Sequence, residues 1–345
     1  MTLNSLIINI KWRLSKIFLS ENQRLWQNVK NCNDDFRKGC IIPLEEYSTA
    51  APVKNDAKKR VVCIYDGKIK NGGLADRLRG IVSVYEVCKE QNIDFKILFT
   101  SPFRLSEFLE PNNVDWEIKE HELNYNTTIT DISYIDTFTG SDYEAKRQKQ
   151  WFRQEFKKKY KEFHVRTNAI FSYNGNYSIL FNELFKPSPK LHNSIEQQKE
   201  IQGNSYISTS FRFMNLLNDF NETVKLDGKL TKEEQNELIA KNIEQLQLLH
   251  DKYPSKRILV NSDSTTFLQR ASELEYVYII PGNITHIDGK NNSNEYEAYE
   301  KTFLDFFMIA NAEKIYLLRT GQMYNSGYPF AASKIYNKPF EKIEF

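Results

Sequence analysis

Short β-branched and aromatic runs alternate along the chain with longer runs in which apolar residues recur every three or four positions. Arg60–Tyr65 is a largely apolar run, typical of a buried strand. The next run predicts an amphipathic helix, because its apolar residues share one face. These residues are Leu78, Ile81, Val82, Tyr85 and Cys88. A second strand is predicted at 95–99, followed by Pro102 at a position suited to a helix start. This alternation predicts a parallel sheet flanked by helices.

The rest of the chain continues the same alternation. We expect strands at 206–213, 257–262, 276–280 and 314–319, and helices at 143–160, 189–200, 231–249, 301–310 and 326–332. The many charged residues of the helix at 143–160 are interpreted as a solvent-exposed face. Residues 111–145 alternate short apolar and polar runs, and no element is assigned there.

The length of 345 residues favours two lobes of comparable size. We expect residues 1–56 to form a helix and a connector, 57–195 a first Rossmann-like lobe, and 196–345 a second. The last helix of the second lobe is free to return to the first lobe.

The first segment predicts a basic amphipathic helix. Its apolar face carries Leu3, Leu6, Ile7, Ile10, Leu14, Ile17 and Phe18. Three cationic residues, Lys11, Arg13 and Lys16, lie off that face, and Trp12 suits a membrane interface. Residues 3–18 are therefore predicted to contact an anionic membrane surface. The alternative is a helix packed on the protein body, since any surface helix has an apolar stripe.

Composition narrows the class of protein. Apolar residues make up 40% and charged residues 27%, as in soluble globular proteins. The net charge of +2 argues against a dedicated nucleic-acid binder. Four cysteines, Cys32, Cys40, Cys63 and Cys88, form no CxxC pair and have no paired histidines nearby, so a zinc site is not expected. Reduced thiols and the lack of an apolar run long enough to span a bilayer favour a cytoplasmic location.

Two places in the chain suit a phosphorylated ligand. Gly72 and Gly73 lie between the first strand and its helix. Glycine allows positive φ and close backbone approach, and the free N–H groups in the first turn of the helix attract anions. An ordinary strand-to-helix turn is the alternative. Arg212 follows a predicted strand, and its guanidinium can hold two phosphate oxygens of a diphosphate. A structural salt bridge is the alternative there.

Further candidates follow the later strands. Asp263 and Ser264 lie at the carboxyl end of the strand at 257–262, where open α/β sheets bind ligands. His286 lies in a loop, as either a ligand contact or a simple loop residue. Asp305 lies on a helix, off its apolar face. Ser326–Ala332 begins a short helix whose N-terminus suits phosphate.

These residues resemble the motifs of the fucosyltransferase superfamily, which includes α1,2-, α1,6- and protein O-fucosyltransferases. Gly72–Leu78 resembles the G-x-G-N-[QR] element, Ser210–Arg212 the H-x-R motif, and Ser326–Ala332 the S-x-F-S-x-x-A motif. The order and spacing of the three agree with the family over about residues 60–335. The sequence departs from the motifs at Ser210 (histidine), Phe213 (a second arginine), Pro329 (serine) and Asp76 (asparagine).

The resemblance implies a GT-B fold, in which two Rossmann-like lobes face each other across a cleft. It implies an acceptor-binding first lobe, and GDP-fucose as the donor substrate held by the second lobe, with no metal and no cofactor. Arg212 would neutralise the charge that develops on the β-phosphate, Ser326, Gly327 and Tyr328 would meet the diphosphate, and Asp305 or Asp263 would contact guanine or ribose.

An inverting transfer needs a general base, and Asp76 is the candidate. The alternative is that Asp76 pairs with Arg77 or Arg79. The expected activity is transfer of fucose to a bacterial surface glycan, such as capsule or O-antigen, or to a lipid-linked oligosaccharide, on the inner face of the cell membrane. The alternatives are another donor, such as GDP-mannose or a GDP-heptose, and a non-catalytic protein that binds nucleotide sugars for an assembly machine.

Overall fold

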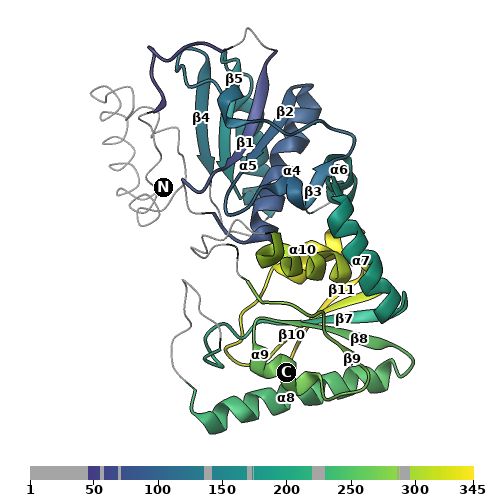
Figure 1. The fold of residues 1–345 in the computed structure, drawn as a ribbon. Coiled ribbons are helices and arrows are strands. Elements are labelled where there is room, and N and C mark those ends of the chain that lie inside the picture. Colours follow the sequence, from purple (N-terminus) through teal and green to yellow (C-terminus); the bar gives the residue numbers. More distant parts are fainter. Residues whose placement is uncertain are drawn as a thin grey trace. The chain divides into compact units, whose positions relative to one another are not determined.

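The computed structural model describes residues 46–54, 58–68, 71–135, 142–168, 173, 175–219, 230–285, 287 and 296–345, which form two compact units (Figure 1). Among them, the first unit comprises the residues up to Asn71, Asp76–Ser101 and those from Val114 to Asn168. The second comprises Gly72–Ala75, Pro102–Asn113 and the residues from Tyr173 onward. The helix expected at 3–18, its membrane surface, Cys32, Cys40 and His286 all lie outside the described residues.

A four-stranded parallel sheet forms the centre of the first unit. Its order is β2 (Asp94–Phe99), β1 (Arg60–Tyr65), β5 (Glu162–Thr167) and β4 (Thr130–Ile135). Two helices, α4 (Leu74–Gln91) and α5 (Asp142–Glu155), run beside each other in this unit (Figure 1). The predicted apolar face of α4 is buried, with no member more than 7% exposed.

Close contact between α4 and the sheet depends on Gly80. A Cβ atom there would lie 2.1 Å from the carbonyl oxygen of Thr167 at the end of β5. On the other face of the sheet, Val62, Ile64 and Leu98 pack against Ile118 and Leu123. These two residues flank the 3₁₀ turn η3 (Glu120–Glu122).

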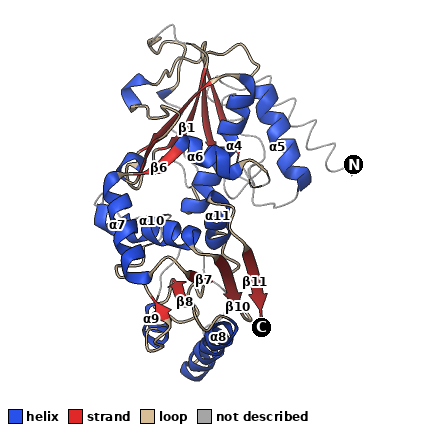
Figure 2. Cartoon of the chain, turned by 90° about the vertical axis from the view of Figure 1, so that its right-hand side faces the viewer, coloured by secondary structure: helices blue, strands red, loops and turns tan. Residues whose placement is uncertain are grey.

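A five-stranded parallel sheet forms the centre of the second unit. Its order is β11 (Phe340–Glu344), β10 (Lys314–Arg319), β7 (Tyr206–Phe211), β8 (Arg257–Ser262) and β9 (Val277–Tyr278). Figure 2 shows α8 (Lys232–Lys252) and α9 (Thr265–Ala271) on one side of this sheet, and α7 (Pro189–Gln202), α10 (Tyr296–Asn311) and α11 (Tyr328–Ile335) on the other. The unit also holds α6 (Tyr177–Leu184) and a short antiparallel pair, β3 (Leu109–Pro111) with β6 (Phe185–Pro187).

Most predicted elements are confirmed, including the start of α8. Thr231 caps that helix and exchanges bonds with Glu234, as a capping box does. The helix predicted at Pro102 is wrong, because the chain there forms only the 3₁₀ turn η2 (Leu105–Glu107). The turn brings Phe103 and Phe108 onto Phe303 of α10, with ring centroids 5.3 and 4.2 Å away. Burial of these rings outweighs helix continuation.

Two further predictions need correction. The charged face of α5 is not all solvated, because Lys149 pairs with Glu86 of α4 at 2.9 Å and with Glu90 at 2.7 Å. Asp305 does not lie on an exposed face of α10: it is 7% exposed, because Lys301 and a strand side chain pair with it. The strands β3, β4, β5, β6 and β11 were not predicted.

Candidate functional site

Three neighbouring strands of the second unit bring polar groups to one edge of its sheet. The register pairs Phe211 of β7 with Ser262 of β8, and Ser210 of β7 with Leu317 of β10. Arg212, Asp263 and the segment that follows β10 therefore all start at the carboxyl edge. Open parallel sheets bind their ligands at this edge.

Asp263 holds the loop that carries Arg212. Its Oδ1 accepts the N–H of Phe213 at 2.8 Å, and its Oδ2 accepts the N–H of Met214 at 2.7 Å. The same Oδ2 lies 3.4 Å from Nη1 of Arg212. Burial raises the pKa of the Asp263 carboxyl, although Arg212 and the two N–H groups oppose the shift. Because Asp263 is 3% exposed and both its oxygens are engaged, the geometry fits orientation of Arg212 better than contact with a ligand.

The salt bridge weighed as the alternative role of Arg212 is therefore present. A guanidinium carries five N–H donors, so an ion pair and a phosphate contact can share one side chain.

The loop after β7 has an unusual backbone conformation. Met214 and Asn218 have φ values of 56° and 57°, in the left-handed region that residues other than glycine rarely adopt. Asp219 ends the described part of this loop. Its Oδ2 accepts the hydroxyl of Ser264 at 2.7 Å and the N–H of Thr266 at 2.8 Å. The first turn of α9 is therefore already filled by an internal carboxylate, and Ser264 is buried as the cap of that helix.

The start of α11 differs from the start of α9. Its N-cap is Gly327, without a side-chain cap, and a Cβ atom at Gly327 would meet nothing within 4 Å. The backbone N–H of Tyr324 donates to the carbonyl oxygen of Arg212 at 2.9 Å, which ties the approach to α11 to the arginine loop. The hydroxyl of Ser326 accepts the N–H of Tyr328 at 3.3 Å. An uncapped helix start beside an arginine suits a diphosphate.

The side chain of Tyr328 anchors α11 rather than facing this start. Its hydroxyl donates to the carbonyl oxygen of Thr302 in α10, and burial raises its pKa well above the ordinary value. The Tyr328 hydroxyl is therefore not placed to meet an anion at the start of α11.

Asp305 belongs to a buried network behind the edge. Its Oδ1 accepts Lys301 Nζ at 3.0 Å, and its Oδ2 accepts the Asn261 amide of β8 at 2.7 Å. Lys301 also donates to the carbonyl oxygen of Ile280 at 2.8 Å, beyond β9. Burial raises the pKa of Asp305, and Lys301 opposes that shift. The network joins α10 to β8 and to the loop after β9.

The loop between β1 and α4 carries the other predicted site. Gly73 does not have a positive φ, so the left-handed turn that glycine allows is not formed at this residue, and a Cβ atom there would meet nothing within 4 Å. The chain enters α4 at Leu74 without needing one. Gly72 precedes it in the same loop. Asp76 lies in the first turn of α4, 35% exposed, with its Oδ1 2.7 Å from Nη2 of Arg79. This ion pair is the one that was weighed against a catalytic role.

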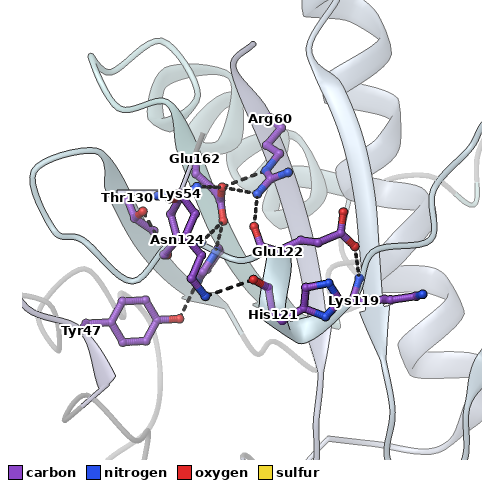
Figure 3. Close-up of polar contacts among 10 residues, drawn as sticks. Tyr47, Lys54, Arg60, Lys119, His121, Glu122, Asn124, Thr130 and Glu162 are labelled. Carbon is purple, nitrogen blue, oxygen red and sulfur yellow. Dashed lines mark hydrogen bonds and ion pairs between the residues drawn. The ribbon is translucent and has the colours of Figure 1, made fainter. Parts of the chain in front are cut away.

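A buried polar network that the sequence analysis missed lies in the first unit (Figure 3). Glu162 Oε2 accepts the Arg60 Nε–H at 2.8 Å and the Asn124 amide at 2.7 Å, and Oε1 lies 2.7 Å from His164 Nε2. His164 Nδ1 lies 2.6 Å from the hydroxyl of Tyr47.

One tautomer of His164 satisfies both contacts. Nε2–H donates to the carboxylate, and Nδ1 accepts from the tyrosine hydroxyl. Burial lowers the pKa of His164. The His164 and Asn124 hydrogen bonds outweigh burial at Glu162 and lower its pKa to about 2. A neutral imidazole and an ionised carboxylate are therefore buried together.

A shallow depression of about 670 Å³ lies beside this network. It is lined by Glu46, Lys54, Glu120, His121 and Tyr125. Farther along the same sheet, Asp66 makes a bidentate ion pair with Arg166. Nη1 of Arg166 lies 2.5 Å from Oδ1 of Asp66, and Nη2 lies 2.7 Å from Oδ2. Burial raises the pKa of Asp66, but Arg166 outweighs this and lowers it overall. Asp66 is thus a weaker proton acceptor than its place at the strand end suggests.

Within the described residues, no group of three or more His, Cys, Asp or Glu side chains is arranged to hold a metal ion. None of the helices in the described part of the chain is long and apolar enough to cross a membrane.

Comparison of the whole chain with known proteins gives a result only at the level of structure. The sequence matches no protein-family model and no curated protein. The fold matches NodZ α-1,6-fucosyltransferase soaked with GDP-fucose, at a TM-score of 0.51 and 12% identity, over 81% of this chain and 93% of that one. It also matches a FUT1 variant from Arabidopsis thaliana in complex with GDP. That match has a TM-score of 0.51 and 12% identity, and it covers 93% of this chain and 77% of that one.

A third match is the apo form of POFUT1, at a TM-score of 0.50 and 9% identity, over 85% of this chain and 99% of that one. The predicted α/β fold class, with two parallel-sheet units, is confirmed. The chain therefore shares its fold with these three fucosyltransferase structures.

Proposed function

We propose that this protein is an inverting glycosyltransferase that moves fucose from GDP-fucose to a hydroxyl group of a glycan. The observation that carries the proposal is the carboxyl edge of the second sheet, where Arg212 is tied to the uncapped start of α11 through the Tyr324 N–H. A cation and a helix N-terminus at one place suit a nucleoside diphosphate. The fold supports this choice, since two of its matches were solved with GDP or GDP-fucose.

In the proposed reaction, the bond between fucose C1 and the β-phosphate oxygen breaks, and GDP leaves with the electron pair. Arg212 stabilises the negative charge that grows on that oxygen, and the N-terminus of α11 stabilises the rest of the diphosphate. Together they supply the charge neutralisation, so no metal is required by this scheme. Asp263 acts as a positioning residue for Arg212, and Asp305 supports the edge from behind.

The acceptor hydroxyl attacks C1 from the opposite face and loses its proton to a carboxylate. We assign this role to Asp76, which is 35% exposed and bound by one contact to Arg79. Asp66 is the competing carboxylate, but its two oxygens are held by Arg166 and its pKa is lowered.

We place the acceptor among bacterial surface glycans or lipid-linked oligosaccharides. The support is the basic amphipathic sequence at 3–18, which suits work at the inner membrane surface. Acceptors of this kind carry many hydroxyl groups, so the linkage position is a matter for product analysis.

Isothermal titration with GDP, GDP-fucose, GDP-mannose and a UDP-sugar, without added metal, tests the donor. GDP-fucose should bind more tightly than the other nucleotide sugars, and Arg212→Ala should strongly weaken the binding of GDP-fucose. Arg270→Ala is the matched control, because Arg270 pairs with Glu273 at an exposed position. Preference for GDP-mannose would change the donor, and binding of GDP-sugars without release of GDP to any acceptor would favour the non-catalytic alternative. Binding of a UDP-sugar alone, or of nothing, would reject the proposal.

A further inference from the structure

One aromatic side chain at the proposed nucleotide edge is not accounted for by the fold. Tyr324 is 49% exposed, although it lies in the segment between β10 and α11 that borders Arg212. Its neighbour Met323 is fully buried in the core of the second unit. The ring of Tyr324 therefore contributes little to packing.

The backbone of Tyr324 is held in place on both sides. Its N–H donates to the carbonyl oxygen of Arg212 at 2.9 Å, and its carbonyl oxygen accepts the N–H of Ser326 at 3.0 Å. Just before it, the carbonyl oxygen of Met323 accepts Nε–H of Arg319 at 2.6 Å. A fixed backbone that presents an aromatic ring to solvent is a pre-organised surface for a flat ligand.

We propose that Tyr324 is the stacking platform for the guanine base of the donor. This inference rests on the proposed function, because it assumes that the diphosphate lies between Arg212 and the start of α11. Tyr324 is two residues from Ser326, so the base of a nucleotide anchored there is within reach of the ring. Stacking on an aromatic face needs no hydroxyl group, and it favours a planar base over a saccharide.

Titration with GDP and GDP-fucose separates the possibilities. Tyr324→Ala and Tyr324→Leu should weaken the affinity for both ligands roughly tenfold or more. Tyr324→Phe should bind both ligands like the wild type, since it keeps the ring. Tyr143→Ala is the matched control, because Tyr143 is 69% exposed and lies on α5 of the first unit. Melting temperatures of all variants show whether the fold is kept.

Three results would overturn the inference. Unchanged affinity of Tyr324→Ala for GDP would show that no base stacks there. A loss confined to GDP-fucose would show that the ring contacts the sugar, and an equal loss in Tyr324→Phe would assign the contact to the hydroxyl. A wild-type protein that binds no GDP would instead reject the proposed function, which keeps the two failures apart.

Discussion

Asp263 binds both the side chain of Arg212 and the backbone of the loop that carries Arg212. The carboxylate oxygen that lies 3.4 Å from Nη1 of Arg212 also accepts the N–H of Met214. Met214 has a φ of 56°, so the acid stabilises a backbone conformation that is unfavourable by itself. The position of the guanidinium is thus set by a buried group of the neighbouring strand end.

Asp263→Asn should therefore lower both stability and donor affinity. An amide has only one acceptor oxygen, so one backbone N–H of the loop loses its partner, at a cost of about 1–3 kcal/mol. We expect a lower melting temperature together with weaker GDP binding. Asp115→Asn is the control, because its side chain is 85% exposed in a pair with Lys96. Normal GDP affinity in a destabilised Asp263→Asn would show that Asp263 does not orient Arg212.

Asp76→Asn separates a base from a structural ion pair. If Asp76 accepts the acceptor's proton, kcat should fall by about 10²–10⁴ while GDP binding and melting temperature stay near normal. Arg79→Gln removes the same half-buried ion pair without touching the carboxylate. Equal loss of kcat in the two variants would assign Asp76 to structure.

Gly73, just before α4, and Gly80, within it, should respond differently to replacement by alanine. Gly80→Ala places a methyl group 2.1 Å from the Thr167 carbonyl oxygen, so α4 must move away from β5. We expect a large fall in the unfolding midpoint, or loss of soluble protein. Gly73→Ala meets nothing within 4 Å and requires no positive φ, so it should leave the midpoint unchanged. Comparable midpoints for the two variants would contradict the observed packing of α4.

The stability of the first unit should decrease as the pH is lowered through the acid range. His164 and Glu162 both have lowered pKa values in the folded state, so the unfolded chain binds more protons than the folded one. The contribution of His164 is complete above its ordinary pKa of 6.5 and is lost as the pH falls below it. That of Glu162 is complete above 4.5 and is lost as the pH falls towards about 2.

Urea unfolding from about pH 8 to about pH 5 measures the histidine part of this dependence. The wild type should lose stability across that range, and His164→Gln should lose less. His192→Gln, at an exposed position, is the control. Identical slopes for the wild type and His164→Gln would show that protonation of His164 is not coupled to unfolding.

The sequence predicts best where local chemistry decides the structure. Strands such as β1 and β8 are largely apolar, and Arg212 and Asp263 could be singled out because they follow predicted strands. β5 was missed because Glu162, His164 and Arg166 give it the appearance of a partly solvated segment following a charged helix. These side chains are buried, since Arg60 and Asp66 pair with two of them across a hundred residues of chain.

The remaining site residues depend on similar long-range pairing. Asp219 binds the first turn of a helix that begins 46 residues later, at Thr265, and Lys301 donates to the carbonyl oxygen of Ile280, 21 residues earlier in the chain. No spacing or periodicity marks such residues in advance. Tyr324 is recognisable only once its exposure and its bond to Arg212 are known.

The bond between Tyr47 and His164 also decides where the chain can be shortened. A natural way to ask whether residues 3–18 bring the protein to liposomes is to remove everything before Lys58. That cut would also delete Tyr47, and with it the partner of a histidine buried in the sheet. A drop in flotation could then reflect a damaged first unit instead of a lost anchor. Cutting before Glu46, or reversing the charges of Lys11, Arg13 and Lys16 in the full chain, keeps the two effects separate.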